Sequence, residues 1–251
     1  MCFANTLKNY ILHIFEQITF IFAALLKKTL IFFFLLLQVS VLRAQCVNTD
    51  TDTTIAELYP RFILPQAALG PDFPSIKLLK TALAGFEMHF RAHSFKRTDI
   101  ITLIDFSLPS DKERLWVIDL VKKKVLIHCL VSHGRNSGEV MAEKFSNNPG
   151  SCESSPGFYT TGESYIGKHG LSLALDGLET GINDKARERA IVIHGADYVS
   201  AEFIKNYGRL GRSLGCPAVP EELSKEIIET IKGGSCLFIY APHTKYLIFP
   251  R

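Results

Sequence analysis

The feature that most restricts the fold of this chain is a series of short apolar segments separated by glycine-rich or polar turns. Their β-branched content predicts strands rather than helices. Helical spacing of apolar residues occurs twice, from the candidate N-cap Ser75 to about residue 93 and from Pro220 to Ile231. We therefore expect a mostly-β domain with flanking helices, an α+β fold. The predicted strands are 100–106, 114–120, 125–131, 171–175, 191–193 and 235–240.

The N-terminus has the order of charge and hydrophobicity that is typical of an export signal. Lys27 and Lys28 precede an apolar run over residues 30–42, shorter than the roughly 20 residues that a transmembrane helix needs. We interpret residues 1–44 as a signal peptide or an N-terminal membrane anchor, with cleavage favoured over retention. Cys46 also suggests a lipoprotein, although Gln45 before it matches that signal poorly. Any membrane contact is predicted to run through this segment alone.

Charge and motifs exclude several classes of function. The net charge of +3 comes from residues 1–44, because basic and acidic side chains are equal in number in the rest. No basic stripe with interleaved aromatic residues is present, so we expect no binding to nucleic acid. The sequence contains neither HExxH nor CxxC, and we predict no metal and no cofactor. Cys129 and Cys236 lie in predicted strands and could form a disulfide, but free buried thiols are the simpler expectation.

The segment from Ile191 to Val219 carries the candidate chemistry. His194 follows an apolar strand and Cys216 stands in a glycine-flanked turn, so a loop that folds back would bring the two together. An imidazole beside a thiol accepts its proton and creates a thiolate nucleophile. Gly215 leaves the backbone accessible to a substrate carbonyl. We therefore treat Cys216, His194 and Gly215 as candidate catalytic residues.

The neighbours of the cysteine suggest how a substrate could be held. Pro217 has no N–H, so an oxyanion hole would need the amide of Leu214, Gly215 or Cys216. Arg212 and Ser213 offer a guanidinium and a hydroxyl, which suit a peptide carboxylate. A buried cysteine and a buried histidine with structural roles remain the alternative for each residue taken alone. His133, in a polar loop between two predicted strands, is interpreted as structural.

Three blocks of sequence together resemble the murein L,D-transpeptidase catalytic domain (the YkuD-like family). They are Ser155-Pro156-Gly157-Phe158-Tyr159, Ile193-His194-Gly195 and Ser213-Leu214-Gly215-Cys216. The resemblance implies a β-sandwich or barrel with an open catalytic cleft, in which Cys216 is the nucleophile and His194 the base. It implies substrate contacts at Arg212, Ser213, Gly195 and Tyr159. It also implies an enzyme of the bacterial cell envelope, in the periplasm or on the outer face of the cytoplasmic membrane.

By the same resemblance, the partners would be peptidoglycan stem peptides, as donor and as acceptor. Cys216 would form a thioester with a tetrapeptide stem, and an amine of a second stem would resolve it into a 3-3 cross-link. An L,D-carboxypeptidase that uses water as acceptor, or a non-catalytic cell-wall binding protein, is the alternative. On this basis we assign residues 45–110 to a linker and helical prefix and residues 111–251 to the catalytic domain.

The sequence departs from the family pattern in ways that suggest a divergent branch. Gly157 follows Pro156 directly, and Leu214 stands where many members have histidine. Pro217-Ala218-Val219 also lacks the basic residue that commonly follows the cysteine. Arg209 or Arg212 is the candidate for supplying that charge.

Overall fold

The computed structural model describes residues 73–242 and 244, and their backbone centres on one eight-stranded sheet. The strand order is β3-β2-β1-β8-β4-β5-β6-β7, which leaves β3 and β7 at the edges. Neighbouring strands are antiparallel except for β1 with β8 and β6 with β7. The strands are β1 (Ile100–Asp105), β2 (Leu115–Asp119), β3 (Lys124–Cys129), β4 (Gly157–Gly167), β5 (Gly170–Gly177), β6 (Val192–Ala196), β7 (Ala218–Pro220) and β8 (Cys236–Tyr240).

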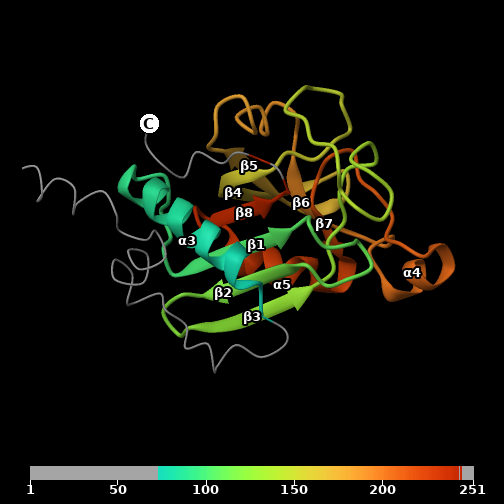
Figure 1. Ribbon diagram of the computed structural model, residues 1–251, viewed down its shortest axis with the longest axis horizontal. Helices are drawn as coiled ribbons and strands as arrows, with labels where there is room; N and C mark the ends of the chain where they lie inside the picture. Colours follow the sequence, from blue (N-terminus) through green and yellow to red (C-terminus); the bar gives the residue numbers. More distant parts are fainter. Residues whose placement is uncertain (1–72, 243, 245–251) are drawn as a thin grey trace, which may run out of the picture. The chain divides into compact units, whose positions relative to one another are not determined.

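Helices cover both faces of the sheet. Helix α3 (Ile76–Arg91) packs with Ile101 and Leu103 of β1, whereas helix α5 (Glu221–Ile231) packs with Ile100 and Ile104, the alternate residues of the same strand. Because successive side chains of a strand point to opposite faces, the two helices lie on opposite sides of β1 (Figure 1). The α5 core draws apolar residues from all eight strands, which requires the sheet to curl around this helix.

The start of α3 follows from local sequence. The hydroxyl of Ser75 accepts a hydrogen bond from the Leu78 amide at 3.2 Å and so caps the first turn. The buried positions of the helix include Leu78, Ala82 and Phe86, which recur at the spacing of one helical face. The helix predicted from Ser75 is therefore confirmed.

Most of the predicted elements are present, and the mostly-β class with flanking helices is confirmed. Strand β4 begins directly after Pro156 and is 11 residues long, because it continues into a hairpin with β5. Helix α4 (Ala201–Tyr207) and strand β7 were not predicted. Helix α4 buries none of its residues, and it projects beyond the β7 end of the sheet (Figure 1).

The predicted division at residue 110 needs correction. Helix α3 and strand β1 fall in the supposed prefix, yet β1 lies inside the sheet between β2 and β8. A boundary after residue 110 would remove a central strand from the core, so this part of the chain belongs to the same domain. The interpretation of residues 1–44 as a signal or anchor lies outside the described residues. Among residues 73–242 and 244, none of the helices combines the length and hydrophobicity needed to cross a membrane.

The two cysteines in strands are free and buried, in agreement with the simpler expectation. Cys129 on β3 and Cys236 on β8 form no disulfide. Burial raises the pKa of the Cys129 thiol to about 12 and also raises that of Cys236. Both thiols are therefore neutral and unreactive near neutral pH, which leaves nucleophilic chemistry to other cysteines.

Candidate active site

The parallel pairing of β6 with β7 brings the histidine and the cysteine together. Parallel neighbours require a long crossover connection, and the segment between His194 and Cys216, with α4 inside it, supplies that connection. His194 on β6 pairs with Ala218 on β7. If this register continues two residues toward the N-terminus of each strand, Cys216 lies opposite Val192. The Cα atoms of Cys216 and His194 are therefore on the order of 8 Å apart, given the spacing of strands and of residues along them.

The thiol of Cys216 lies against the start of β6 and is partly exposed. Its sulfur is 3.7 Å from the carbonyl oxygen of Ala190. Burial raises the pKa of Cys216, and the Val192 amide and the Arg189 charge act in the opposite direction. No hydrogen bond joins the side chains of Cys216 and His194, both of which are described.

His194 is held as a neutral ring of defined orientation. The side chain is buried, and Nδ1 lies 2.8 Å from the carbonyl oxygen of Gly195. A carbonyl can only accept, so Nδ1 carries the proton and the lone pair is on Nε2. Burial is the main cause that lowers the pKa of His194. A lowered imidazole pKa beside a raised thiol pKa favours the neutral pair over the ion pair at rest.

Ser213 shapes the turn that carries Cys216. Its hydroxyl accepts a hydrogen bond from the Gly215 amide at 3.1 Å and donates to the Cys216 carbonyl at 2.6 Å. The side chain is buried, so the structure gives it a role in holding the turn. Because the Gly215 amide is already engaged and Pro217 has none, the amides of Leu214 and Cys216 remain as candidate oxyanion donors.

Both predicted glycines lie where a side chain would not fit. Gly215 has a φ of 128°, and a Cβ there would lie 2.9 Å from the Glu153 carbonyl oxygen. A Cβ at Gly195 would lie 2.9 Å from the Ser224 side chain, so this glycine allows α5 to approach β6. The Gly195 carbonyl, rather than its missing side chain, is the part that faces His194.

Arg212 lies next to the turn that carries Cys216, but it is already paired with a carboxylate. Its Nη1 donates to the carboxylate of Glu139 at 2.6 Å and to the Gly138 carbonyl at 3.1 Å. Arg209 contacts the same carboxylate at 3.0 Å. The two arginines therefore share one exposed counterion, which reduces the charge that either offers to a substrate.

Tyr159 lies in the core rather than at an opening. The side chain is fully buried, and its hydroxyl donates to the Ser155 carbonyl at 2.8 Å. Burial raises the pKa of the phenol. A group with no exposed surface does not meet a substrate, so the predicted contact is corrected to a support for the Ser155 backbone. Tyr198, in contrast, is half-buried, and burial together with the charge of Cys216 raises its pKa to about 12.

A buried polar cluster packs against the turn over residues 213–216. Arg114 is fully buried and donates to the carbonyls of Leu108 at 2.7 Å and Val131 at 3.0 Å, and to Nδ1 of His133 at 2.8 Å. The His133 carbonyl in turn accepts from the Ser213 amide at 3.0 Å. Burial lowers the pKa of His133 to about 4. The prediction of a structural role for His133 is consistent with these contacts.

Two residues near the site were missed by sequence reasoning. His169, in the turn between β4 and β5, stacks on His194 with ring centroids 4.6 Å apart. Arg189, just before β6, lies against the Gly215 backbone, since a Cβ at that glycine would be 3.3 Å from its Nη2. Neither position is marked by a local pattern. Only the order of strands β4, β5 and β6 brings them to the site.

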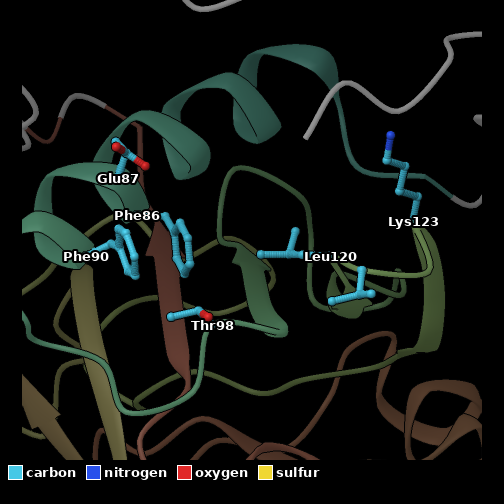
Figure 2. Close-up of a pocket in the computed structure, with 7 residues that line it drawn as sticks. Phe86, Glu87, Phe90, Thr98, Leu120 and Lys123 are labelled. Atoms are coloured by element: carbon cyan, nitrogen blue, oxygen red, sulfur yellow. The ribbon is translucent and has the colours of Figure 1, made fainter. Parts of the chain in front are cut away.

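A separate hollow lies on the α3 side of the sheet. It has a volume of about 400 Å³ and is lined by Phe86, Glu87, Phe90, Thr98, Leu120, Val121 and Lys123. Figure 2 shows the rings of Phe86 and Phe90 extending from α3 toward Thr98 and Leu120. None of the predicted site residues lines it. Among the described residues, no group of three or more His, Cys, Asp or Glu side chains is placed to hold a metal ion.

Comparison with known proteins identifies the family of this chain. Residues 74–240 match the family described as the L,D-transpeptidase catalytic domain. A search of curated protein sequences finds no match.

Similar solved structures include an L,D-transpeptidase from Mycobacterium smegmatis, with 11% identity and a TM-score of 0.35 over 57% of this chain and 59% of that one. The helical cell shape determining protein Pgp2 from Campylobacter jejuni has 15% identity and a TM-score of 0.40, over 60% and 50% of the two chains. Bd1075 from Bdellovibrio bacteriovorus has 17% identity and a TM-score of 0.36, over 59% and 49%. The chain thus spans less than two thirds of the length of each of these structures. On the match over residues 74–240, the chain belongs to the L,D-transpeptidase catalytic domain family.

Proposed function

We propose that this protein is an exported peptidoglycan-modifying cysteine enzyme, an L,D-transpeptidase that forms 3-3 cross-links between stem peptides. The observation that carries the proposal is the register of β6 and β7, which sets Cys216 beside the strand that holds His194. The Nδ1 contact of His194 with Gly195 leaves Nε2 as the proton acceptor. Family membership supports peptide stems of the cell wall as the class of substrate.

The resting state and the first chemical step follow from these protonation states. Cys216 and His194 are both neutral, so the thiol proton moves to Nε2 as the sulfur attacks the carbonyl carbon of the bond to the terminal D-alanine. The amides of Leu214 and Cys216 are placed in the turn to stabilise the oxyanion that forms. The C–N bond then breaks, the imidazolium returns its proton to the leaving amine, and a thioester remains on Cys216.

The second step consumes the thioester. An amine from a second stem attacks the thioester carbonyl, its proton passes to His194, and the C–S bond breaks to release the thiolate and a new amide bond. Water in place of the amine gives a shortened stem instead. The acceptor step therefore depends on which nucleophile reaches the thioester first.

Product analysis tests this proposal. The purified protein is incubated with disaccharide-tetrapeptides, and the products are identified by mass, with Cys216→Ala and His194→Asn as controls. Dimers that lack one D-alanine, absent in both variants, support the transpeptidase. Tripeptides and free D-alanine would assign the protein as a carboxypeptidase, and unchanged substrate would favour a binding role.

A further inference from the structure

Arg189 lies just before β6 and holds its guanidinium group in a fixed position. Nη1 donates to the Ser146 carbonyl at 2.6 Å and to the Ser155 hydroxyl. Nη2 donates to the Glu153 carbonyl at 2.6 Å and to the Ser151 hydroxyl at 3.2 Å. All four acceptors are uncharged, and within the described residues Arg189 forms no salt bridge. Its guanidinium group is therefore held by neutral acceptors alone.

The side chain of Arg189 and the backbone that follows it both lie next to the turn that carries Cys216. The guanidinium packs on the backbone of Gly215, the residue before Cys216, because a Cβ there would be 3.3 Å from Nη2. The sulfur of Cys216 is 3.7 Å from the carbonyl oxygen of Ala190, the residue after Arg189. Two other arginines near the turn, Arg209 and Arg212, both contact Glu139.

We propose that Arg189 is the positioning residue whose fixed cation stabilises the Cys216 thiolate, in place of the basic residue that commonly follows the cysteine. This inference rests on the proposed function, in which Cys216 is the nucleophile. A cation near a partly buried thiol, with no carboxylate bound to it, favours the charged form of that thiol. In agreement, the Arg189 charge lowers the pKa of Cys216 against the effect of burial.

One of the four hydrogen bonds of Arg189 reaches the first of the three family blocks. Ser155 opens the Ser-Pro-Gly block and contacts Arg189 through its hydroxyl. Ser154, before it, donates to the Gly215 carbonyl at 3.1 Å. The guanidinium therefore has two effects that can be separated. Its charge stabilises the thiolate of Cys216, and its hydrogen bonds hold the loop that contains Ser155.

The charge is separated from the geometry by comparing variants of matched shape. Arg189→Gln removes the charge, Arg189→Lys keeps it but loses the forked hydrogen bonds, and Arg187→Gln is the control. Arg187 lies on the same segment but pairs with Asp176 and Glu163. Its removal therefore takes away a cation that is already neutralised.

The readout is the rate of alkylation of Cys216 by iodoacetamide as a function of pH, followed by peptide mass spectrometry to distinguish it from Cys152. At pH 8 we expect Arg189→Gln to react about tenfold more slowly than wild type. Arg189→Lys should stay within about threefold, and Arg187→Gln should be unchanged. Three results would overturn the inference. They are an equal loss of alkylation rate in Arg189→Gln and Arg189→Lys, an unchanged rate in Arg189→Gln, and a loss of rate in Arg187→Gln equal to that in Arg189→Gln.

Thermal unfolding of each variant shows whether it is folded. If Arg189→Gln does not fold, Arg189→Lys decides alone: a rate within threefold of wild type supports a role of charge, and a tenfold loss overturns it. Alkylation requires no peptidoglycan, so the outcome is independent of the proposed reaction. Wild-type protein that is alkylated as expected but does not turn over stem peptides would contradict the function and leave this inference intact.

Discussion

The imidazole rings of His169 and His194 are stacked, with centroids 4.6 Å apart and planes inclined by 23°. His194 is buried on β6, whereas His169 is exposed in the turn between β4 and β5. Two protonated rings at this distance repel, so His169 adds to the effect of burial in lowering the pKa of His194. The turn thereby favours the neutral form of His194, which a general base requires.

Replacement of His169 separates stacking from charge. His169→Phe keeps an aromatic ring but removes the positive charge, so the acid limb of the kcat/KM profile should move to higher pH while the plateau stays near wild type. His169→Ala also loses the stacked contact and should lower the plateau roughly threefold to tenfold. Lys168→Ala, in the same turn, is the control. An acid limb that does not move in His169→Phe would show that the charge of His169 has no influence.

Ser213→Ala should destabilise the protein and slow reactions of Cys216. The change leaves the Gly215 amide and the Cys216 carbonyl without their shared partner, at a cost of about 1–3 kcal/mol in the free energy of unfolding. Leu214→Ala alters an exposed residue of the same turn, 63% exposed, and should leave unfolding nearly unchanged. Urea unfolding and thiol alkylation measure the two effects. Equal stability of both variants would argue that the hydroxyl does not hold the turn.

Stability should decrease as the pH falls from about 6.5 to about 4. The pKa of His133 is lowered from 6.5 to about 4 in the folded protein, so below 6.5 the unfolded state binds a proton that the folded state does not. By linkage, the stability fully present above pH 6.5 is lost progressively toward pH 4, by about 3 kcal/mol for this residue. Denaturant unfolding across that range measures the loss.

The matched variants for this pH effect are His133→Asn and His93→Asn. The amide introduced by His133→Asn would retain an acceptor for Arg114 without a titrating ring, so the acid-dependent loss should shrink. His93 is exposed and has a φ of 55°, a conformation that asparagine tolerates, and its replacement should leave the pH dependence unchanged. An unaltered acid profile in His133→Asn would rule out this histidine as the cause.

Arg114→Met should be among the most destabilising single substitutions, costing about 3–5 kcal/mol in the free energy of unfolding. It removes the donors for two backbone carbonyls and for His133 in a fully buried site. Arg135→Met changes an exposed arginine of the neighbouring loop and serves as control. A thermal midpoint for Arg114→Met equal to that of the control would show that the buried cluster does not stabilise the fold.

The sheet could be predicted from sequence to the extent that its strands are apolar. β1, β2, β3 and β8 carry nearly continuous apolar runs, and in β1, β2 and β8 these are buried on both faces. Helix α4 has no buried residue, and β7 has only three residues, one of them Pro220. Neither element therefore has a repeating pattern of apolar residues that would predict it. The boundary at residue 110 failed for a related reason, since a parallel pairing of β1 with β8 joins distant segments and leaves no local signal.

The same distinction applies to the site. Cys216, Gly215 and His194 stand in short motifs that resemble a known family, so they could be proposed as candidates from the sequence. His169 and Arg189 lie near the site only because of the strand order and the loop contacts. The sequence around these two residues does not predict either of those features. Arg212 was predicted to bind a substrate carboxylate because it stands close to Cys216 in the chain. Its ion-pair partner Glu139 is remote in sequence and so could not be predicted. Contacts between such distant segments are visible only in the folded structure.

The pairing of Cys216 with His194 as nucleophile and base is tested most directly by trapping the covalent intermediate. The purified protein is mixed with a disaccharide-tetrapeptide whose side-chain amine is acetylated, so that it cannot act as acceptor. The reaction is quenched in acid within seconds and examined by intact-protein and peptide mass spectrometry. We predict an adduct of the tripeptide acyl group on Cys216, formed at least about a hundredfold more slowly in His194→Asn. An acyl group on any other residue, or equal rates in wild type and His194→Asn, would contradict the account.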